Sequence, residues 1–194
     1  VTNTLTVTIL DRNEAPSISD QTASVSEIEL NVDGTRREFS NIGTTVGPPL
    51  VGSDPDNANT LNPTKQTLTF SIISGTGNEY FTIDGSTGQV TIAALPSLLT
   101  SAELNFEASN IYMLKIQLED DGVLIGSSTV ATLSTVAELT ISVLNENEYP
   151  IAPDYTLPTA VREDVSIGAA VGVYNQAYDP DNLRTPSTDT LTFS

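Results

Sequence analysis

The sequence contains no cysteine, no histidine and no tryptophan. Without cysteine the chain has no disulfide, thiolate nucleophile or zinc finger, and without histidine it lacks the commonest acid-base residue and metal ligand. Sites for soft metals are therefore not expected, whereas sites built from oxygen ligands remain open. The chain also has no Asn-x-Ser/Thr acceptor, so N-glycosylation of this segment is not expected.

Basic residues are scarce as well. The chain has 7 Lys and Arg against 25 Asp and Glu, and its net charge is −18. Nucleic acids and anionic lipids bind clustered Lys and Arg, so neither is expected as a partner. No apolar run approaches the roughly 20 residues that cross a bilayer, so direct membrane insertion of this segment is not expected either. The partner that this charge balance favours is a cation.

Apolar and polar residues alternate wherever a periodic pattern is legible, as is typical of strands with one buried face. Residues 81–83 and 89–92 are expected to form a hairpin, because the intervening loop contains glycines for its positive-φ positions. Residues 94–110 lose the alternation, and one or two helical turns are expected there. The clearest strand patterns are Leu68, Phe70 and Ile72, then Val90 and Ile92, then Tyr112, Leu114, Ile116 and Leu118.

Parts of the sequence occur twice, which indicates a slice of a tandem array. Residues 11–16 return as 145–150, and in both places an acidic linker closes a strand-like run and ends in proline. The other repeated pairs are 42–47 with 167–172, 54–57 with 179–182, and 68–71 with 191–194. We expect three units: 1–13 as the last strand and linker of an upstream domain, 14–148 as a complete domain with an insert at 28–41, and 149–194 as the opening strands of a downstream domain.

The acidic residues fall into short motifs, each with an ordinary role when taken alone. Asp54-Pro55-Asp56 is good turn chemistry, because Asp caps its own backbone and Pro presets φ. Glu27 alone reads as a solvated glutamate, and Asp120 alone as a residue at a strand end. Their order along the chain is more informative than any single motif.

In this order the motifs resemble those of the cadherin repeat over nearly the whole chain. The resemblance implies an all-β fold of tandem immunoglobulin-like Greek-key β-sandwiches with seven strands, one complete and two partial, joined end to end through Ca²⁺. The similar segments are Val25-Ser26-Glu27 for the first-strand glutamate motif, Asp54-Pro55-Asp56 for DxD, Leu104-Asn105-Phe106-Glu107 for LDRE, Leu118-Glu119-Asp120-Asp121-Gly122 for AxDxG, and the two linkers for DxNDNxP.

The resemblance also implies metal ligands at two junctions between domains. Ca²⁺ takes 6 to 8 oxygen ligands from carboxylates, amides and backbone carbonyls, and these motifs supply all three kinds. At the first junction the implied ligands are Asp11, Asn13, Glu14, Asp54, Asp56 and Asp120. At the second they are Glu27, Glu107, Asn145, Glu148 and Asp181, with Asn147 and Asp179 towards the next domain.

The two junctions differ in charge. Asn145 stands where the pattern has an Asp and where the first linker has Asp11, and Asn105 replaces the Asp of LDRE. From this comparison we expect the first junction to bind Ca²⁺ more tightly than the second.

These observations predict a calcium-rigidified extracellular repeat with a structural or adhesive role. It would act as a rod-like spacer in a surface adhesin or filament, with neighbouring repeats of the same array as partners and homophilic or filament contacts with further copies. The alternative is a carbohydrate-binding module of a secreted protein, for which Tyr80, Tyr149, Tyr155, Tyr174 and Tyr178 are candidate surface contacts. An enzyme is not expected, because glycosidase-like paired carboxylates are already accounted for by the junctions.

Overall fold

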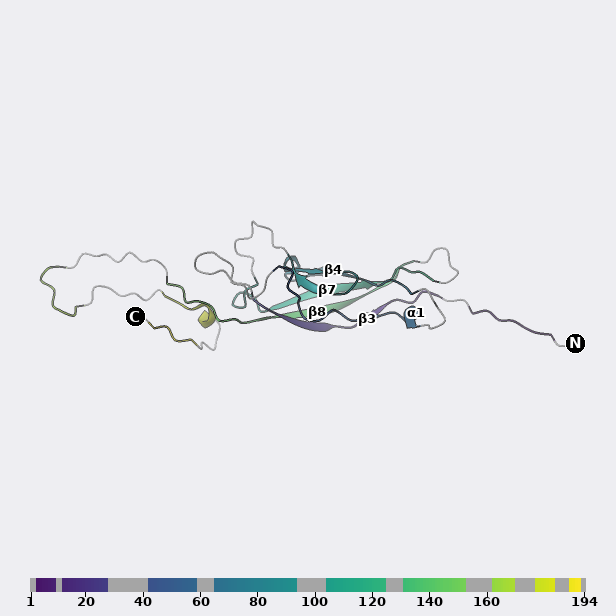
Figure 1. Cartoon of the computed structure of the whole chain (residues 1–194), viewed down its shortest axis with the longest axis horizontal. Helices are drawn as coiled ribbons and strands as arrows, with labels where there is room; N and C mark the ends of the chain where they lie inside the picture. The colour runs from purple at the N-terminus through teal and green to yellow at the C-terminus, as the bar shows by residue number, and fades with distance from the viewer. Residues whose placement is uncertain are drawn as a thin grey trace.

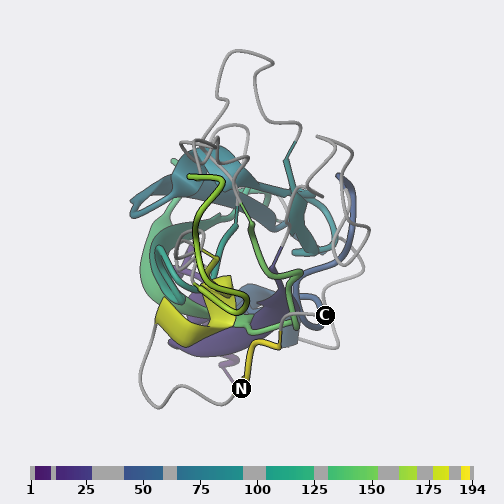
Figure 2. The same cartoon turned by 90° about the vertical axis from the view of Figure 1, so that its left-hand side faces the viewer.

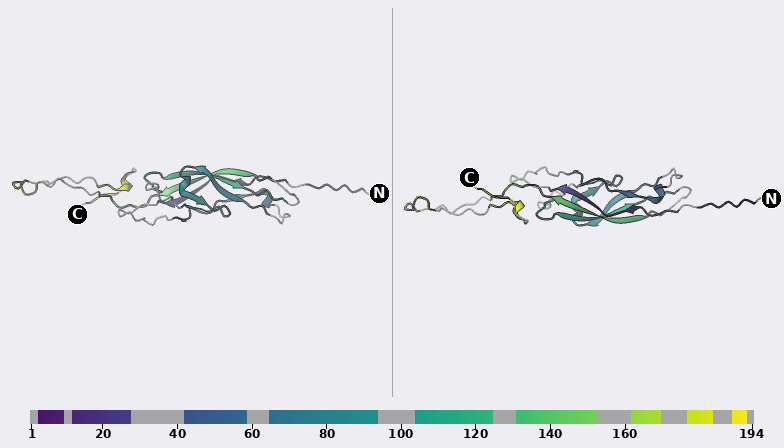
Figure 3. Two further views of the ribbon diagram at one scale, coloured as in Figure 1. Left: turned by 90° about the horizontal axis from the view of Figure 1, so that it is seen from above. Right: turned by 90° about the horizontal axis from the view of Figure 1, so that it is seen from below.

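The structure of the chain is a computed structural model, which describes residues 3–9, 12–27, 42–58, 65–93, 104–124, 131–152, 162–169, 177–183 and 189–192. The strands form a β-sandwich in the middle of an elongated molecule (Figure 1). The N-terminal stretch extends beyond one end of the sandwich, and residues 162–169 lie beyond the other (Figure 3). The two linkers therefore meet the sandwich at opposite ends.

One layer of the sandwich is a four-stranded sheet in the order β2-β8-β7-β4. These strands are β2 (Gln21–Ser26), β8 (Ser134–Leu144), β7 (Ile111–Glu119) and β4 (Thr69–Gly75). β2 runs parallel to β8, and the other pairs are antiparallel. The alternation expected along β7 is confirmed, because Tyr112, Leu114, Ile116 and Leu118 are all buried.

The second layer is built from shorter pieces. β5 (Phe81–Ile83) and β6 (Val90–Ile92) form the expected hairpin, in which Phe81 pairs with Ile92 and Gly88 has a φ of 71°. Residues 44–46 join this hairpin, since the Val46 nitrogen donates to the Val90 oxygen at 2.9 Å. β1 (Ser17–Ile18) pairs antiparallel with β3 (Gly52–Ser53) to form a separate two-stranded sheet. Three short helical segments complete the described elements: α1 (Pro55–Ala58), η1 (Asn78–Tyr80) and η2 (Pro180–Leu183).

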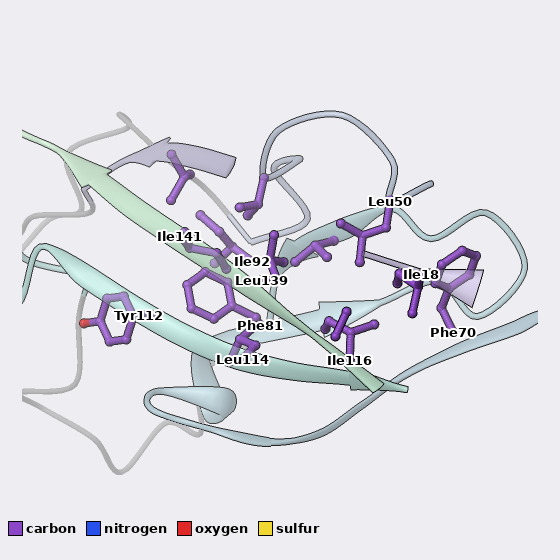
Figure 4. Packing of buried hydrophobic residues seen from close by; sticks show 14 of the residues in the cluster. Ile18, Leu50, Phe70, Phe81, Ile92, Tyr112, Leu114, Ile116, Leu139 and Ile141 are labelled. Atoms are coloured by element: carbon purple, nitrogen blue, oxygen red, sulfur yellow. The ribbon is translucent and has the colours of Figure 1, made fainter. Parts of the chain in front are cut away.

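The apolar core fills the space between the layers (Figure 4). Side chains of Leu114, Leu139 and Ile141 from the large sheet pack with Ile92 of the hairpin, and each of the four is at most 1% exposed. The predicted burial of Phe70, Phe81 and Tyr112 is confirmed. Tyr80, expected as a surface contact, instead packs its ring 5.5 Å from that of Tyr112, because η1 turns it towards the core.

Several described residues lie outside regular pairing or divide between the two layers. Residues 3–9 form no strand, and Leu5, Val7 and Ile9 are exposed, because no described strand lies beside them to form a sheet. Residues 104–110 form a turn with no helix, and residues 94–103 and the insert 28–41 lie outside the described residues. The first strand of the sandwich is split, since β1 pairs in one layer and β2 in the other.

Strand direction determines which segments meet at each end of the sandwich. β2 and β8 both run antiparallel to β7, so Glu27 and the linker 145–150 emerge beside the turn that precedes β7. Figure 2 views the molecule from this end. At the opposite end, β7 finishes at Asp120 beside the start of β4, because Thr69 pairs with Glu119. Topology alone thus gathers the acidic motifs into two groups.

Candidate metal centre

The first junction is a buried polar cluster of Asn13, Asp54, Asp56, Gln66 and Asp120, each at most 8% exposed. Asn13 lies at its centre. Its Nδ2 donates to both carboxylate oxygens of Asp120, at 3.2 and 3.3 Å, and to the Ala131 oxygen at 3.0 Å. The linker is thereby tied to the end of β7.

Asp54 and Asp56 connect the same linker to the segment that follows β3. The Asp54 carboxylate accepts from the Asp56 nitrogen at 2.8 Å, which fixes the tight turn at Pro55. The Asp56 carboxylate then accepts from the Glu14 nitrogen at 3.0 Å. Among the described residues, Asp54 Oδ2 has no hydrogen-bond partner although it is buried. A buried carboxylate oxygen in this state is energetically costly unless a proton or a cation joins it.

At the second junction, three glutamates from distant parts of the chain converge. One carboxylate oxygen each from Glu27, Glu107 and Glu148 lies within 4.8 Å of the others. Glu27 is fully buried, and its two oxygens accept from the backbone nitrogens of Phe106 and Glu146, both at 2.7 Å. Glu27 therefore holds the start of the linker and the 104–107 turn in place.

The second junction repeats the Asp-x-Asp arrangement of the first. The Asp181 nitrogen donates to Asp179 at 3.1 Å, and the Glu148 nitrogen donates to Asp181 at 2.8 Å. Asn145 Nδ2 adds a bond of 3.0 Å to the other oxygen of Asp181. The repeat seen in the sequence is thus also a repeat of hydrogen bonds.

Burial shifts the titration of three of these acids. Loss of solvation raises the pKa of Glu27, Asp54 and Asp179 above the ordinary values. Neighbouring charge adds to this effect: Asp56 and Asp120 further raise the pKa of Asp54, and Asp181 and Asp189 further raise that of Asp179. Each junction therefore favours either a proton or a cation.

These shifts predict how stability depends on pH when divalent cations are removed. A carboxyl whose pKa is higher in the folded state binds more protons there, so the free energy of unfolding rises as the pH falls from 7 towards 4.5. We expect the urea midpoint in chelator to increase over this range. The variant Glu27→Gln should flatten the increase, whereas Glu79→Gln, at an exposed position, should leave it intact. A midpoint that falls on acidification would contradict this account.

Most of the predicted ligands lie in these two groups. Asp11 lies outside the described residues, the Glu14 and Asn147 side chains are exposed, and Asn145 is exposed but bonded to Asp181. Sequence reasoning missed Gln66 and Asp189. Aligning the Leu-Thr-Phe-Ser segments at 68–71 and 191–194 would have paired them, since each lies two residues before its segment.

No family model matches the chain. It is 33% identical to mouse Protocadherin Fat 4 over 103 residues, which is 53% of this chain and 2% of that protein. It is 29% identical to human Protocadherin Fat 1 over 174 residues, which is 88% of this chain and 3% of that protein. It is 31% identical to human Protocadherin-23 over 113 residues, or 58% of this chain and 3% of that protein. The chain thus spans a small fraction of these relatives' length.

The chain is similar to protocadherins, in agreement with the resemblance to the cadherin repeat. Solved structures that resemble it include the human Desmocollin-1 ectodomain, with a TM-score of 0.49, 22% identity and coverage of 70% of this chain and 21% of that one. Chicken VE-cadherin EC1-2 gives a TM-score of 0.42 and 24% identity, over 70% of this chain and 52% of that one. The family resemblance and the all-β, immunoglobulin-like sandwich expected from the sequence are confirmed.

Similarity to protocadherins supports the expected extracellular location. Among the described residues, no helix has the length and apolar character to cross a membrane.

Proposed function

We propose that this cadherin repeat is a structural segment of an extracellular adhesive or filamentous protein, and that Ca²⁺ stiffens its junctions into a rod-like spacer. The observation that carries the proposal is the burial of acidic clusters at both ends of the sandwich, where each linker passes. Like charges held this close repel unless a cation lies between them. A bound ion would replace that repulsion with shared coordination across the linker.

The available ligands suit Ca²⁺. All are hard oxygens from carboxylates, amides and backbone carbonyls, and histidine and cysteine are absent from the sequence. Oxygens that share one Ca²⁺ at about 2.3 to 2.6 Å lie at most about 5 Å apart. The spacing of Glu27, Glu107 and Glu148, within 4.8 Å, satisfies this condition. The unpartnered Asp54 Oδ2 supports an ion at the first junction in the same way.

The proposed ligand sets follow the two groups. At the first junction they comprise Asp11, Asn13, Glu14, Asp54, Asp56 and Asp120, and at the second Glu27, Glu107, Asn145, Asn147, Glu148, Asp179 and Asp181. We likewise propose units at 1–13, 14–148 and 149–194, with the insert at 28–41. Neighbouring repeats of the same array are the proposed partners, together with further copies of the parent protein through self-association. Function in such a spacer resides in length and stiffness, and no catalytic step is proposed.

The carbohydrate-binding alternative gains no support. Glycan platforms need exposed rings, and Phe70, Phe81 and Tyr112 are buried in the core. Tyr149 and Tyr178 are exposed, but they lie at the linker, where the backbones of Ile151 and Tyr178 bond to each other. Tyr155 and Tyr174 lie outside the described residues.

Small-angle X-ray scattering tests the spacer directly. With Ca²⁺ well above about 10⁻³ M, the upper end of the range for extracellular sites, we expect a single extended form and the largest maximum dimension. Excess chelator should shorten the maximum dimension and broaden the distance distribution. The double variant Asp56→Asn/Asp181→Asn is the control, because it removes one carboxylate from each junction and should no longer respond to Ca²⁺. An identical maximum dimension of the wild type in both buffers would refute the proposal.

A further inference from the structure

Gln66 and Asp189 occupy corresponding positions, and the backbone of each is held by an equivalent pair of hydrogen bonds to an Asn side chain. We call this pair of bonds the backbone clamp. The Asn57 side chain donates to the Gln66 oxygen at 3.0 Å and accepts from the Gln66 nitrogen at 2.7 Å. Asn182 makes the same pair of bonds with Asp189, at 3.0 and 3.1 Å. Each clamped residue therefore has a fixed position relative to its Asp-x-Asp turn.

The side chain of Gln66 points into the acidic cluster of the first junction. Its Nε2 lies 2.6 Å from Asn13 Oδ1 and 3.2 Å from Asp56 Oδ2. Gln66 is 4% exposed, and among the described residues its Oε1 has no hydrogen-bond partner. A buried, unpartnered carbonyl oxygen beside Asp56 is a ligand atom for a hard cation.

At the second junction the corresponding side chain is a carboxylate. One oxygen each of Asp179, Asp181 and Asp189 lies within 4.8 Å of the others. Asp189 also contributes to the raised pKa of Asp179, which is the mark of a nearby negative charge. The two junctions thus differ at one clamped position by one formal charge.

We propose that this clamped position sets the Ca²⁺ affinity of the half of each junction formed by the following domain. This inference rests on the proposed function and adds side-chain ligands to it. At the first junction the Gln66 amide donates N–H groups to Asn13 Oδ1 and Asp56 Oδ2, which are oxygens that a cation would bind. An ion must therefore break these hydrogen bonds before it binds. At the second junction Asp189 adds a third carboxylate to the site.

The physical basis is competition between hydrogen bonds and coordination. The oxygens of Asn13 and Asp56 that accept from Gln66 are the ones that the ion would need. An amide supplies a weaker, neutral ligand after its own donor bonds are lost, whereas a carboxylate loses no donor bonds and adds Coulomb attraction. Ligand charge is one of the quantities that tunes Ca²⁺ affinity in proteins.

The test is a Ca²⁺ titration of the full chain followed by NMR at two backbone amides. The Glu14 N–H reports the first junction, since it bonds to Asp56, and the Glu148 N–H reports the second, since it bonds to Asp181. For Gln66→Glu, an almost isosteric change, we expect the Glu14 midpoint to fall about tenfold and the Glu148 midpoint to stay unchanged. For Asp189→Asn we expect the reverse, an approximately tenfold weaker midpoint at Glu148 alone.

Gln21→Glu is the matched control. It makes the same amide-to-acid change at a half-buried position in β2, where the bonding partners of the side chain are Ser19 and Val51. It should leave both midpoints unchanged. The β7 amide signals confirm that each variant is folded, and Asp189→Asn tests the idea independently if Gln66→Glu fails to fold.

The outcomes separate the two proposals. If neither amide responds to Ca²⁺ in the wild type, the proposed function fails, and with it any role of Gln66 in the site. If both respond but Gln66→Glu and Asp189→Asn leave the midpoints unchanged, the junctions bind Ca²⁺ and only the inference about the clamped position is overturned.

Discussion

Replacing Glu27 by Gln is expected to weaken Ca²⁺ binding at the second junction by at least about 100-fold, or about 2.7 kcal/mol. Glu27 is fully buried, and its oxygens lie within 4.8 Å of those of Glu107 and Glu148. The substitution removes one charged ligand and also turns an amide N–H group towards backbone nitrogens that need an acceptor. Calorimetry on the full chain, combined with NMR at the Glu148 amide, measures the loss.

The same variant should leave the first junction unaffected, because its cluster lies at the opposite end of the sandwich. The Glu14 amide therefore serves as an internal control, and Glu79→Gln serves as a charge-matched control at an exposed position. Retention of wild-type affinity at Glu148 in the Glu27→Gln variant would show that the three glutamates are not ligands of a common ion.

Alternation of apolar residues was sufficient to predict much of the fold. Along β7 and in the hairpin of β5 and β6, the buried face follows from a period of two residues, and each register is consistent with that face. The directions of β2, β7 and β8 then bring Glu27 and Asp120 to opposite ends of the sandwich.

Local pattern did not predict which polar side chains enter the clusters. Gln66 reads as an ordinary residue before a strand, and its role depends on the Asn57 clamp and on Asn13, which is 53 positions away. The split of the first strand into β1 and β2 also depends on both sheets at once. Conversely, Leu5, Val7 and Ile9 have a good strand pattern but form no strand, because a pattern needs a neighbouring strand to become a sheet.

The structure also changes the expected ranking of the two junctions. On the preceding-domain side, the first junction has the additional carboxylate, since Asp11 corresponds to Asn145. On the following-domain side, the second junction has it, since Asp189 corresponds to Gln66. At these two positions the formal charges balance. We therefore expect the two junctions to have similar overall affinity and to differ in which side of the junction, preceding or following domain, binds its ion more tightly.

The substitution Gly75→Ala is expected to lower the free energy of unfolding by at least about 3 kcal/mol, and the melting temperature by about 6 to 12 °C. Gly75 ends β4 opposite the buried Leu114, after a register irregularity between Ile72 and Ser74, and has a φ of 140°. A methyl group there would lie 2.7 Å from the Leu114 Cα and against the Met113 carbonyl oxygen. These are backbone atoms of the central strand, so the sheet itself would have to shift.

Gly43→Ala is the matched control, because Gly43 also has a positive φ, of 83°, but among the described residues nothing lies within 4 Å of an added methyl group. It should cost only the conformational strain of a left-handed residue, about 1 to 2 kcal/mol. Urea unfolding of both variants in excess Ca²⁺ and in chelator separates the clash from the strain. Equal losses in the two variants would mean that strand β4 yields easily at Gly75, and that close approach to β7 does not require glycine there.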